Sequence, residues 1–240
     1  MAMQPLADAP SLGDRAYEAI RDAILELTLR PGQQVAVNQL ADLLRVSRTP
    51  VRDAMLRLQR EGLMTVVPHK GAYVSRISVQ DVQDIFELRI LLERYAARIA
   101  ATRMTAEDRA RIEETMQQAA RAFEQGDPLL AADTAGLIHD MLVRKTNNGR
   151  LAACLMDLDS HYGRIRHLAV AIPGRFERSQ QEHRAILAAL QQADAEAAGM
   201  AVVQHLQSVR DDVLANLDTW VDSLEHDREA GVNKRVTQVT

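Results

Sequence analysis

Apolar and polar positions along this 240-residue chain repeat in two different ways. Up to about residue 76, runs with helical spacing are followed by two short runs with alternating or β-branched character, which is typical of a few helices and a hairpin. The predicted elements are a helix that ends at Pro31-Gly32, helices over 39–44 and 48–61, and strands over 64–67 and 72–75 joined by the turn 68–71. We expect Asn38 to cap the second helix and Ser47 or Thr49 to cap the third.

From residue 78 onwards the pattern is helical throughout, and clusters of Gly, Pro and Asn divide it into separate helices. The predicted helices cover residues 78–103, 105–125, 128–146, 148–170, 175–192 and 194–226. The fold class is therefore mainly α, with a small helix-and-hairpin domain followed by an all-α helical bundle. The expected division is a disordered arm over 1–11, domains over 12–76 and 77–226, and a flexible tail over 227–240.

Charge is segregated between the two predicted domains. The whole chain has a net charge of -4 and a pI near 6.0, which alone argues against a general nucleic-acid binder. Residues 1–76, however, carry 10 basic against 8 acidic side chains, and residues 77–240 carry 19 against 25. The slightly basic first domain and the acidic second domain are therefore expected to have different partners.

Composition excludes several classes of protein. Aromatic residues make up 3% of the chain, too few for a single-strand binder that stacks bases. The single cysteine, Cys154, excludes an internal disulfide and a zinc ribbon, and we expect it to be a core residue, as we do Met55, Met141 and Met156. No signal peptide and no span of roughly 18 apolar residues are present, so the protein is expected to be cytoplasmic, away from membranes.

The helix predicted over 48–61 carries the clearest chemical signal in the first domain. Five arginines and one acid lie between residues 45 and 60. Arg48 and Arg52 are four residues apart, project from one face near the helix start, and suit guanine in a major groove. Ser47 and Thr49, with the free N–H groups of the helix start, suit phosphate oxygens. An arginine-rich helix flanked by a helix and a hairpin is typical of a winged helix-turn-helix, whereas spacing alone also fits a solvated helix face.

This stretch resembles the GntR family of bacterial transcription regulators. The resemblance covers about residues 12–76 and rests on Arg30-Pro31-Gly32, on the run from Leu40 to Leu58, on Glu61-Gly62-Leu63, and on Lys70-Gly71-Ala72-Tyr73-Val74. It implies a homodimer whose two recognition helices read the half-sites of an inverted repeat in double-stranded operator DNA. By motif position, it assigns DNA contact to Asn38, Ser47, Arg48, Thr49 and Arg52, and in the wing to His69, Lys70 and Gly71.

Three histidines of the second domain lie on the apolar stripes of three different predicted helices. These are His139, His183 and His205, and each is expected to point into the bundle. Imidazoles from facing helices can converge on a metal, whereas a single inward histidine is more often a core residue. The spacing of these residues leaves both interpretations open.

The second domain also resembles the effector domain of the FadR subfamily, the FCD type, over about residues 78–224. The residues that match are Arg89 and Glu93, His139, the run from Asn148 to Leu151, Glu182 to Leu190, Ala193 to Ala198, and Gln204 to Leu206. The resemblance implies that three histidines, with an Asp four residues before the first, hold a divalent metal, and that a small carboxylate effector binds on or beside it.

The chain departs from this pattern at one position. Ala135 stands where the resemblance implies Asp, and Asp133 lies off that helical face. Three imidazoles can still hold Zn or Ni, with weaker affinity and charge compensation. The alternative is a metal-free pocket in which the histidines bind the effector directly.

Two arginines are candidates for binding an anionic effector. Arg89 and Arg164 are expected to point inward, although Arg89 can instead pair with Glu93, and Arg164 can lie on a solvated face.

Taken together, the sequence predicts a transcription regulator, a repressor controlled by a small organic acid, and not an enzyme. The alternatives are a metal-dependent enzyme that uses the three histidines, and a small-molecule binding protein whose first domain contacts only protein.

Overall fold

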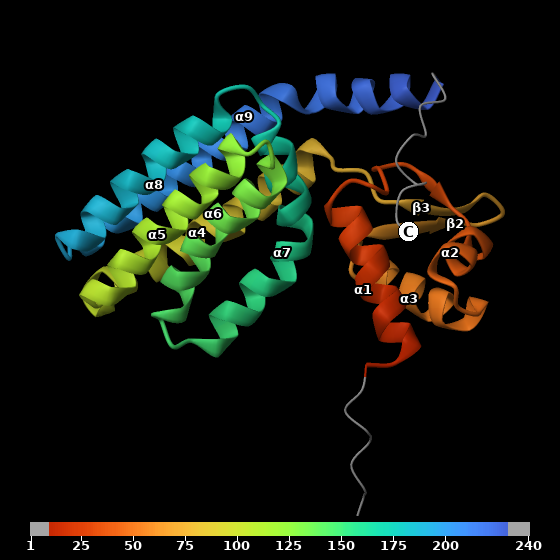
Figure 1. Cartoon of the computed structure of the whole chain (residues 1–240), viewed down its shortest axis with the longest axis horizontal. Coiled ribbons are helices and arrows are strands. Elements are labelled where there is room, and N and C mark those ends of the chain that lie inside the picture. Colours follow the sequence, from red (N-terminus) through yellow and green to blue (C-terminus); the bar gives the residue numbers. More distant parts are fainter. Residues whose placement is uncertain (1–9, 230–240) are drawn as a thin grey trace, which may run out of the picture. The chain divides into compact units, whose positions relative to one another are not determined.

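The computed structural model describes residues 10–229, and its contacts divide the chain into two units (Figure 1). The first unit ends at Arg76 and the second begins at Ile77. Most of the predicted arm and tail lies outside the described residues. Within the described part, Ser11 caps the first helix and the last helix continues to Glu229.

The first unit combines helices with a small antiparallel sheet. Its elements are α1 (Leu12–Leu25), β1 (Gln34–Val35), α2 (Val37–Leu44), α3 (Arg48–Arg60), β2 (Met64–Val67) and β3 (Gly71–Val74). Arg45 adopts a left-handed conformation (φ 53°) that ends α2, and Ser47 starts α3 two residues later. A tight turn therefore separates the two helices, as a helix-turn-helix requires.

The hairpin β2–β3 forms the wing, and β1 adds a third strand on its other side in the order β1-β3-β2. Tyr73 of β3 lies opposite Thr65 on one side and Gln34 on the other. Gly71 has φ 112°, and a Cβ there would lie 3.0 Å from the Gln34 amide nitrogen, so this turn position needs glycine. The strand β1 was not predicted, because two residues are too few to show alternation.

The core of the first unit joins all its elements. Ile24 of α1 and Val51 and Leu58 of α3 are fully buried, and Leu63 and Val74 extend the same cluster to the sheet. The apolar face of α3 is thus turned inward, and its opposite face is left to solvent.

The second unit is helical. Its elements are α4 (Val79–Arg103), α5 (Ala106–Glu124), α6 (Pro128–Arg144), α7 (Gly149–Val170), α8 (Arg175–Gln191) and α9 (Ala195–Glu229). Helix α9 packs against α4 and α8, α5 packs against α6 and α8, and α7 contacts α4, α6, α8 and α9 (Figure 1). The mainly α fold, with a winged helix-turn-helix and a helical bundle, is confirmed.

Local capping explains why the predicted starts of α4, α5, α6 and α7 lie within one residue of the observed ones. Ser78 and Thr105 form capping boxes with Asp81 and Asp108, and Asp127 and Asn148 bond to backbone N–H groups of the next helices. These side chains satisfy donors that the first helical turn leaves unpaired.

Three expectations about individual residues are wrong. Asn38 lies within the first turn of α2, whose N-cap is Ala36. Cys154 is exposed, and Met156 is 70% exposed, because this part of α7 is open to solvent on most of its sides. Among helices formed by residues 10–229, none combines the length and apolarity that a membrane span requires.

Candidate functional site

The first candidate site is the outer face of α3. Arg48, Thr49 and Arg52 are exposed there, on the side opposite the buried face. Ser47 is the N-cap, but its side chain makes no capping hydrogen bond, so its hydroxyl is not used by the helix. The sequence-predicted residues are thus brought together at the start of one exposed helix, where N–H groups and arginines favour a polyanion.

One of the five arginines near α3 has a structural role. The Arg57 guanidinium lies 2.7 Å from a carboxylate oxygen of Asp14 and 3.9 Å from the ring centre of Tyr17. Tyr17 in turn donates to Glu61. Arg57 therefore fastens α1 to α3, whereas Arg45, Arg48, Arg52 and Arg60 are exposed.

The wing tip presents the other predicted contacts. His69, Lys70 and Gly71 are all exposed, and His69 has φ 60°. The Lys70 carbonyl accepts hydrogen bonds from the Gln34 side chain at 2.8 Å and from the Tyr73 hydroxyl at 3.1 Å. These bonds fix the turn while its basic side chain stays in solvent. Asn38 is also exposed, on α2.

The second candidate site is the meeting point of the three histidines, which we call the histidine trio. His139 on α6, His183 on α8 and His205 on α9 are all buried. The distance between ring centres is 5.5 Å for His139 and His183, 5.1 Å for His139 and His205, and 4.5 Å for His183 and His205. One nitrogen from each ring lies within 4.8 Å of the others. The predicted convergence of three helices on this point is present.

A carboxylate on α4 orients the first histidine. Nδ1 of His139 lies 2.5 Å from Oε2 of Glu93, which leaves Nε2 for another partner. Glu93 Oε1 lies 2.7 Å from Arg89 Nε. Burial alone would raise the pKa of Glu93, but Arg89 and His139 lower it to about 2. The acid is therefore ionised and holds the imidazole in a fixed tautomer.

A second carboxylate orients His205 in the same way. Nδ1 of His205 lies 2.7 Å from Oε2 of Glu182, which also contacts Arg175. Burial lowers the pKa of His205 to about 4, against the opposing effect of Glu182. At neutral pH this imidazole is uncharged, the form in which histidine binds metals.

His183 has no such orienting group. It is 3% exposed, and neither of its ring nitrogens has a hydrogen-bond partner among the described residues. Burial, followed by the nearby His205 and His139, lowers its pKa well below the usual value. A buried donor and acceptor without partners are costly, so this ring is suited to an additional ligand.

The donor set of the histidine trio fits a divalent transition metal. Three imidazoles with two carboxylates behind them are a common zinc arrangement. In a tetrahedral site with Zn–N bonds of about 2.1 Å, the ligand nitrogens are about 3.4 Å apart. To bind an ion, the three histidine nitrogens would therefore have to move closer to one another than the 4.8 Å within which they now lie. No carboxylate of the described residues joins the group. Asp133 instead lies 2.7 Å from Arg166 and 2.9 Å from His167, as expected of a residue off that helical face.

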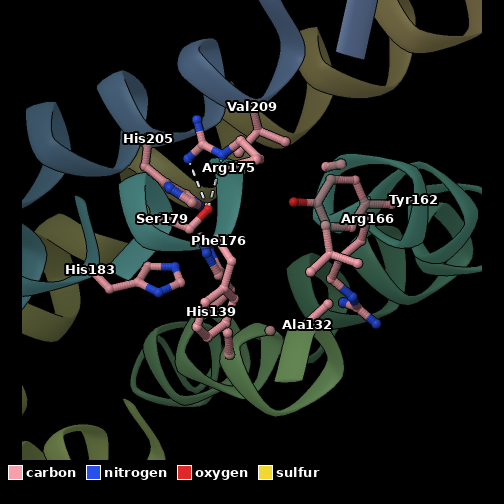
Figure 2. A pocket seen from close by; sticks show the side chains of 14 residues that line it. Ala132, His139, Tyr162, Arg166, Arg175, Phe176, Ser179, His183, His205 and Val209 are labelled. Carbon is pink, nitrogen blue, oxygen red and sulfur yellow. Dashed lines mark hydrogen bonds between the residues drawn. The ribbon is translucent and has the colours of Figure 1, made fainter. Parts of the chain in front are cut away.

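The histidine trio forms one wall of a small pocket, with a cavity volume of about 50 Å³ (Figure 2). Helices α6, α7, α8 and α9 line it. The lining residues are Ala132, Ala135, Gly136, His139, Tyr162, Arg166, Ala169, Val170, Arg175, Phe176, Ser179, His183, His205 and Val209. A mostly apolar pocket with a few converging polar groups is typical of a small-molecule site.

The predicted effector arginines are buried but do not line this pocket. Arg89 is engaged by Glu93 and by the ring of Tyr162, and Arg164 lies elsewhere on α7. Burial lowers the pKa of Arg164 to about 10. The lining cations are instead Arg166 and Arg175, so the pocket gives no support to the predicted effector contacts of Arg89 and Arg164.

Arg175 is the main residue that sequence reasoning missed. It is 1% exposed, and its guanidinium bonds to Ser179, Ser208, Glu182 and Asp212. It therefore ties the start of α8 to α9 beside His205. Its position four residues before Ser179 and eight before His183 is a helical-face signal that could have found it.

Comparisons with known proteins agree with this geometry. The profile of bacterial regulatory proteins of the gntR family matches residues 12–74, and that of the FCD domain matches residues 84–208. The HTH-type transcriptional repressor RspR of Escherichia coli (strain K12) is 27% identical over 204 residues, which are 84% of this chain and 89% of that protein. Because both profiles fall on the predicted regions, the resemblances drawn from sequence motifs are confirmed.

Two solved structures share the fold at 22% sequence identity. One is E. coli McbR/YncC, with a TM-score of 0.73, 87% of this chain covered and 100% of that one. The other is a GntR transcriptional regulator from Rhodococcus sp. RHA1, with a TM-score of 0.72, 86% of this chain covered and 99% of that one. The alternative of a metal-dependent enzyme is therefore rejected: the chain is a DNA-binding transcription regulator that belongs to the gntR family of bacterial regulatory proteins and has an FCD domain as its second unit.

Proposed function

We propose that this regulator binds an inverted repeat as a homodimer, with Arg48 and Arg52 of each copy in the major groove. The exposed α3 face, with Ser47 at its start, supports this assignment. Asn38 and Thr49 add contacts beside it. His69, Lys70 and Gly71 lie against the flanking minor groove or backbone. In this proposal residues 12–76 read the operator, and residues 77–226 bind the effector and the second copy.

An operator selected from random duplex DNA by the wild-type protein tests this assignment. Arg48→Ala and Arg52→Ala should each weaken specific binding by about tenfold or more, because a bidentate base contact contributes roughly 1–3 kcal/mol. Arg111→Ala, an exposed arginine on α5, is the matched control. Unchanged operator affinity in both α3 variants would contradict the assignment, and a selected site without two-fold symmetry would contradict the dimer.

We propose an exposed apolar stripe on α4 as the dimer contact. Leu88, Leu91 and Tyr95 follow one helical face, and Leu91 is 63% exposed. A second copy would cover this stripe by two-fold symmetry. Leu91→Glu should therefore shift the protein to monomer in sedimentation, whereas Met156→Glu on α7 should not; a dimer that persists in Leu91→Glu rules out this contact.

We propose that the second unit holds Zn²⁺ or Ni²⁺ through His139, His183 and His205. The observation that carries this proposal is His183, which is buried with both ring nitrogens unpartnered. The ion would supply a Lewis acid for an effector oxygen, and the chain's residues would orient the imidazoles and exclude water. Elemental analysis should find about one ion per chain, and His183→Ala should lose it; wild-type protein that stays metal-free in excess Zn²⁺ contradicts the proposal.

We propose a small carboxylic acid as the effector and repression as the mode of control. The acid would bind at the histidine trio, with or without the ion, in the pocket that adjoins it. An effector changes operator affinity only as far as it binds the two protein states differently. Release of the operator on binding an acid is the expected result, in the cytoplasm where the DNA lies; tighter operator binding in its presence would contradict this mode of control.

A further inference from the structure

The pocket contains a polar group opposite the histidine trio that neither the motifs nor the spacing singled out. Tyr162 on α7 is 4% exposed and lines the pocket. Figure 2 shows its hydroxyl directed into the pocket, toward the side on which the histidines lie. No hydrogen bond of this hydroxyl is found among the side chains that the structure describes, and the oxygen is not among the fully enclosed polar atoms. A hydroxyl that faces a pocket without a protein partner can bind a ligand atom.

The ring that carries this hydroxyl is held in place on two sides. Phe86 meets it edge to face at a centroid distance of 5.6 Å, and the Arg89 guanidinium lies 3.7 Å from its centre. Burial raises the pKa of Tyr162, so its hydroxyl stays protonated at neutral pH. The group is therefore a fixed hydrogen-bond donor, which needs no rearrangement to bind an acceptor.

The wall between the two ends of the pocket is largely apolar. Ala132, Ala135, Ala169, Val170 and Phe176 contribute methyl groups, methylene groups and a ring. A ligand hydroxyl facing this wall would lose its hydrogen bonds to water and gain none. The wall therefore selects a hydrocarbon body and disfavours polyhydroxylated acids.

The charges of the pocket decide what kind of acceptor Tyr162 can take. Arg166 is paired with Asp133 at 2.7 Å. Arg175 is already engaged by Glu182 and Asp212. The Nε of Arg166 has no hydrogen-bond partner, but Asp133 already balances the charge of this side chain. A second carboxylate at the Tyr162 end would thus be buried without a net positive charge to balance it, which is unfavourable. A neutral oxygen such as a carbonyl needs only the hydroxyl.

From these observations we infer that Tyr162 is a specificity-determining residue, and that the effector is a monocarboxylic acid with a hydrocarbon body and a neutral oxygen acceptor at its far end. The inference rests on the proposed function, because it places the carboxylate at the histidine trio. Oxo acids with the carbonyl near the end of a short chain are the simplest members of this class.

Calorimetry on the Zn²⁺-loaded full chain tests the inference with defined probes. Levulinate and the next two longer oxo acids are each compared with the unsubstituted acid of equal chain length and with the corresponding dicarboxylate. At least one oxo acid should bind roughly five- to tenfold more tightly than both its unsubstituted acid and its dicarboxylate, which is the gain in affinity expected from one net hydrogen bond. Tyr162→Phe should remove this preference and leave the affinity of the unsubstituted acid unchanged.

The outcomes separate this inference from the proposed function. If acids bind but no oxo acid is preferred, or if Tyr162→Phe keeps the preference, the inference is overturned and the carboxylate effector stands. If no acid binds with or without Zn²⁺, the proposed effector itself fails. Tyr162→Phe must also match the wild type in zinc content and melting temperature; a loss in either shows a structural role for the hydroxyl and overturns the inference.

Discussion

Nδ1 of His139 lies 2.5 Å from Oε2 of Glu93, and this contact joins the histidine trio to α4, the first helix after the DNA-reading unit in the sequence. The same carboxylate pairs with Arg89. A change in the ligands of His139 therefore acts directly on a buried ion pair of α4.

Removal of Glu93 should affect both metal binding and folding. Glu93→Ala removes the nearer carboxylate partner of the buried Arg89 and leaves only Asp159, at 3.7 Å, which should cost up to about 3–5 kcal/mol of unfolding free energy. Glu93→Gln should weaken zinc binding by about 10- to 100-fold, because the orienting carboxylate is lost. Chemical denaturation and competition with a chromogenic chelator measure the two effects.

Glu196→Gln is the control for Glu93. Glu196 pairs with Arg94 and Arg98 at the surface, where an ion pair contributes less than about 1 kcal/mol. An equal loss of unfolding free energy in Glu93→Gln and Glu196→Gln would show that the buried Glu93 pair stabilises the fold no more than a surface ion pair does.

Arg175 should be more important for stability than its neighbour Arg178. Arg175→Met removes a buried cation and leaves Glu182 and Asp212 without their common partner, so a loss of about 3–5 kcal/mol is expected. Arg178 contacts the same Asp212 from an exposed position, and Arg178→Ala should cost less than about 1 kcal/mol. Thermal unfolding measures the melting temperatures of both variants, and similar values would contradict the structural role of Arg175.

An acid introduced at Ala135 should join the histidine trio. Ala135 lines the pocket one helical turn before His139, so Ala135→Asp places an oxygen near the three nitrogens. Zinc affinity should rise by about tenfold or more, since a fourth protein ligand and a compensating charge are added. Ala132→Asp, one turn further away in the same pocket, is the control, and an equal rise there would indicate charge alone.

The salt dependence of DNA binding should distinguish the arginines near α3. Arg45→Ala and Arg60→Ala should lower affinity for all duplexes equally and reduce the salt slope by about one, as expected for phosphate contacts. Arg52→Ala should lower affinity for the operator more than for unrelated duplexes. Fluorescence anisotropy at several salt concentrations measures both effects; equal losses on all duplexes for Arg52→Ala would assign it to the backbone.

The inward orientation of the histidines could be predicted because each lies on an apolar stripe, and a stripe must face the interior of a bundle. Their convergence on one point was left open by the spacing and was implied only by the resemblance. The same reasoning failed for Cys154 and Met156. An apolar side chain on a helix can also lie on the outer face, and an outward position leaves no sign in the residue type itself.

Buried charges were harder to predict than buried histidines. Arg89 was expected to bind an effector or to pair with Glu93, and the structure has the pair. Arg175 and Tyr162 were missed because their roles depend on Asp212 and Arg89, partners that are distant in sequence. Helical periodicity predicts which face is inward, but it does not indicate which polar groups meet there.

The central claim is that a ligand of the histidine trio controls operator binding. Its most direct test is the operator affinity of the Zn²⁺-loaded protein, with and without an acid that calorimetry shows to bind. The account predicts a change of at least about fivefold in the wild type and none in His183→Ala. A bound acid that leaves the wild-type affinity unchanged, or that shifts the His183→Ala variant equally, would contradict it.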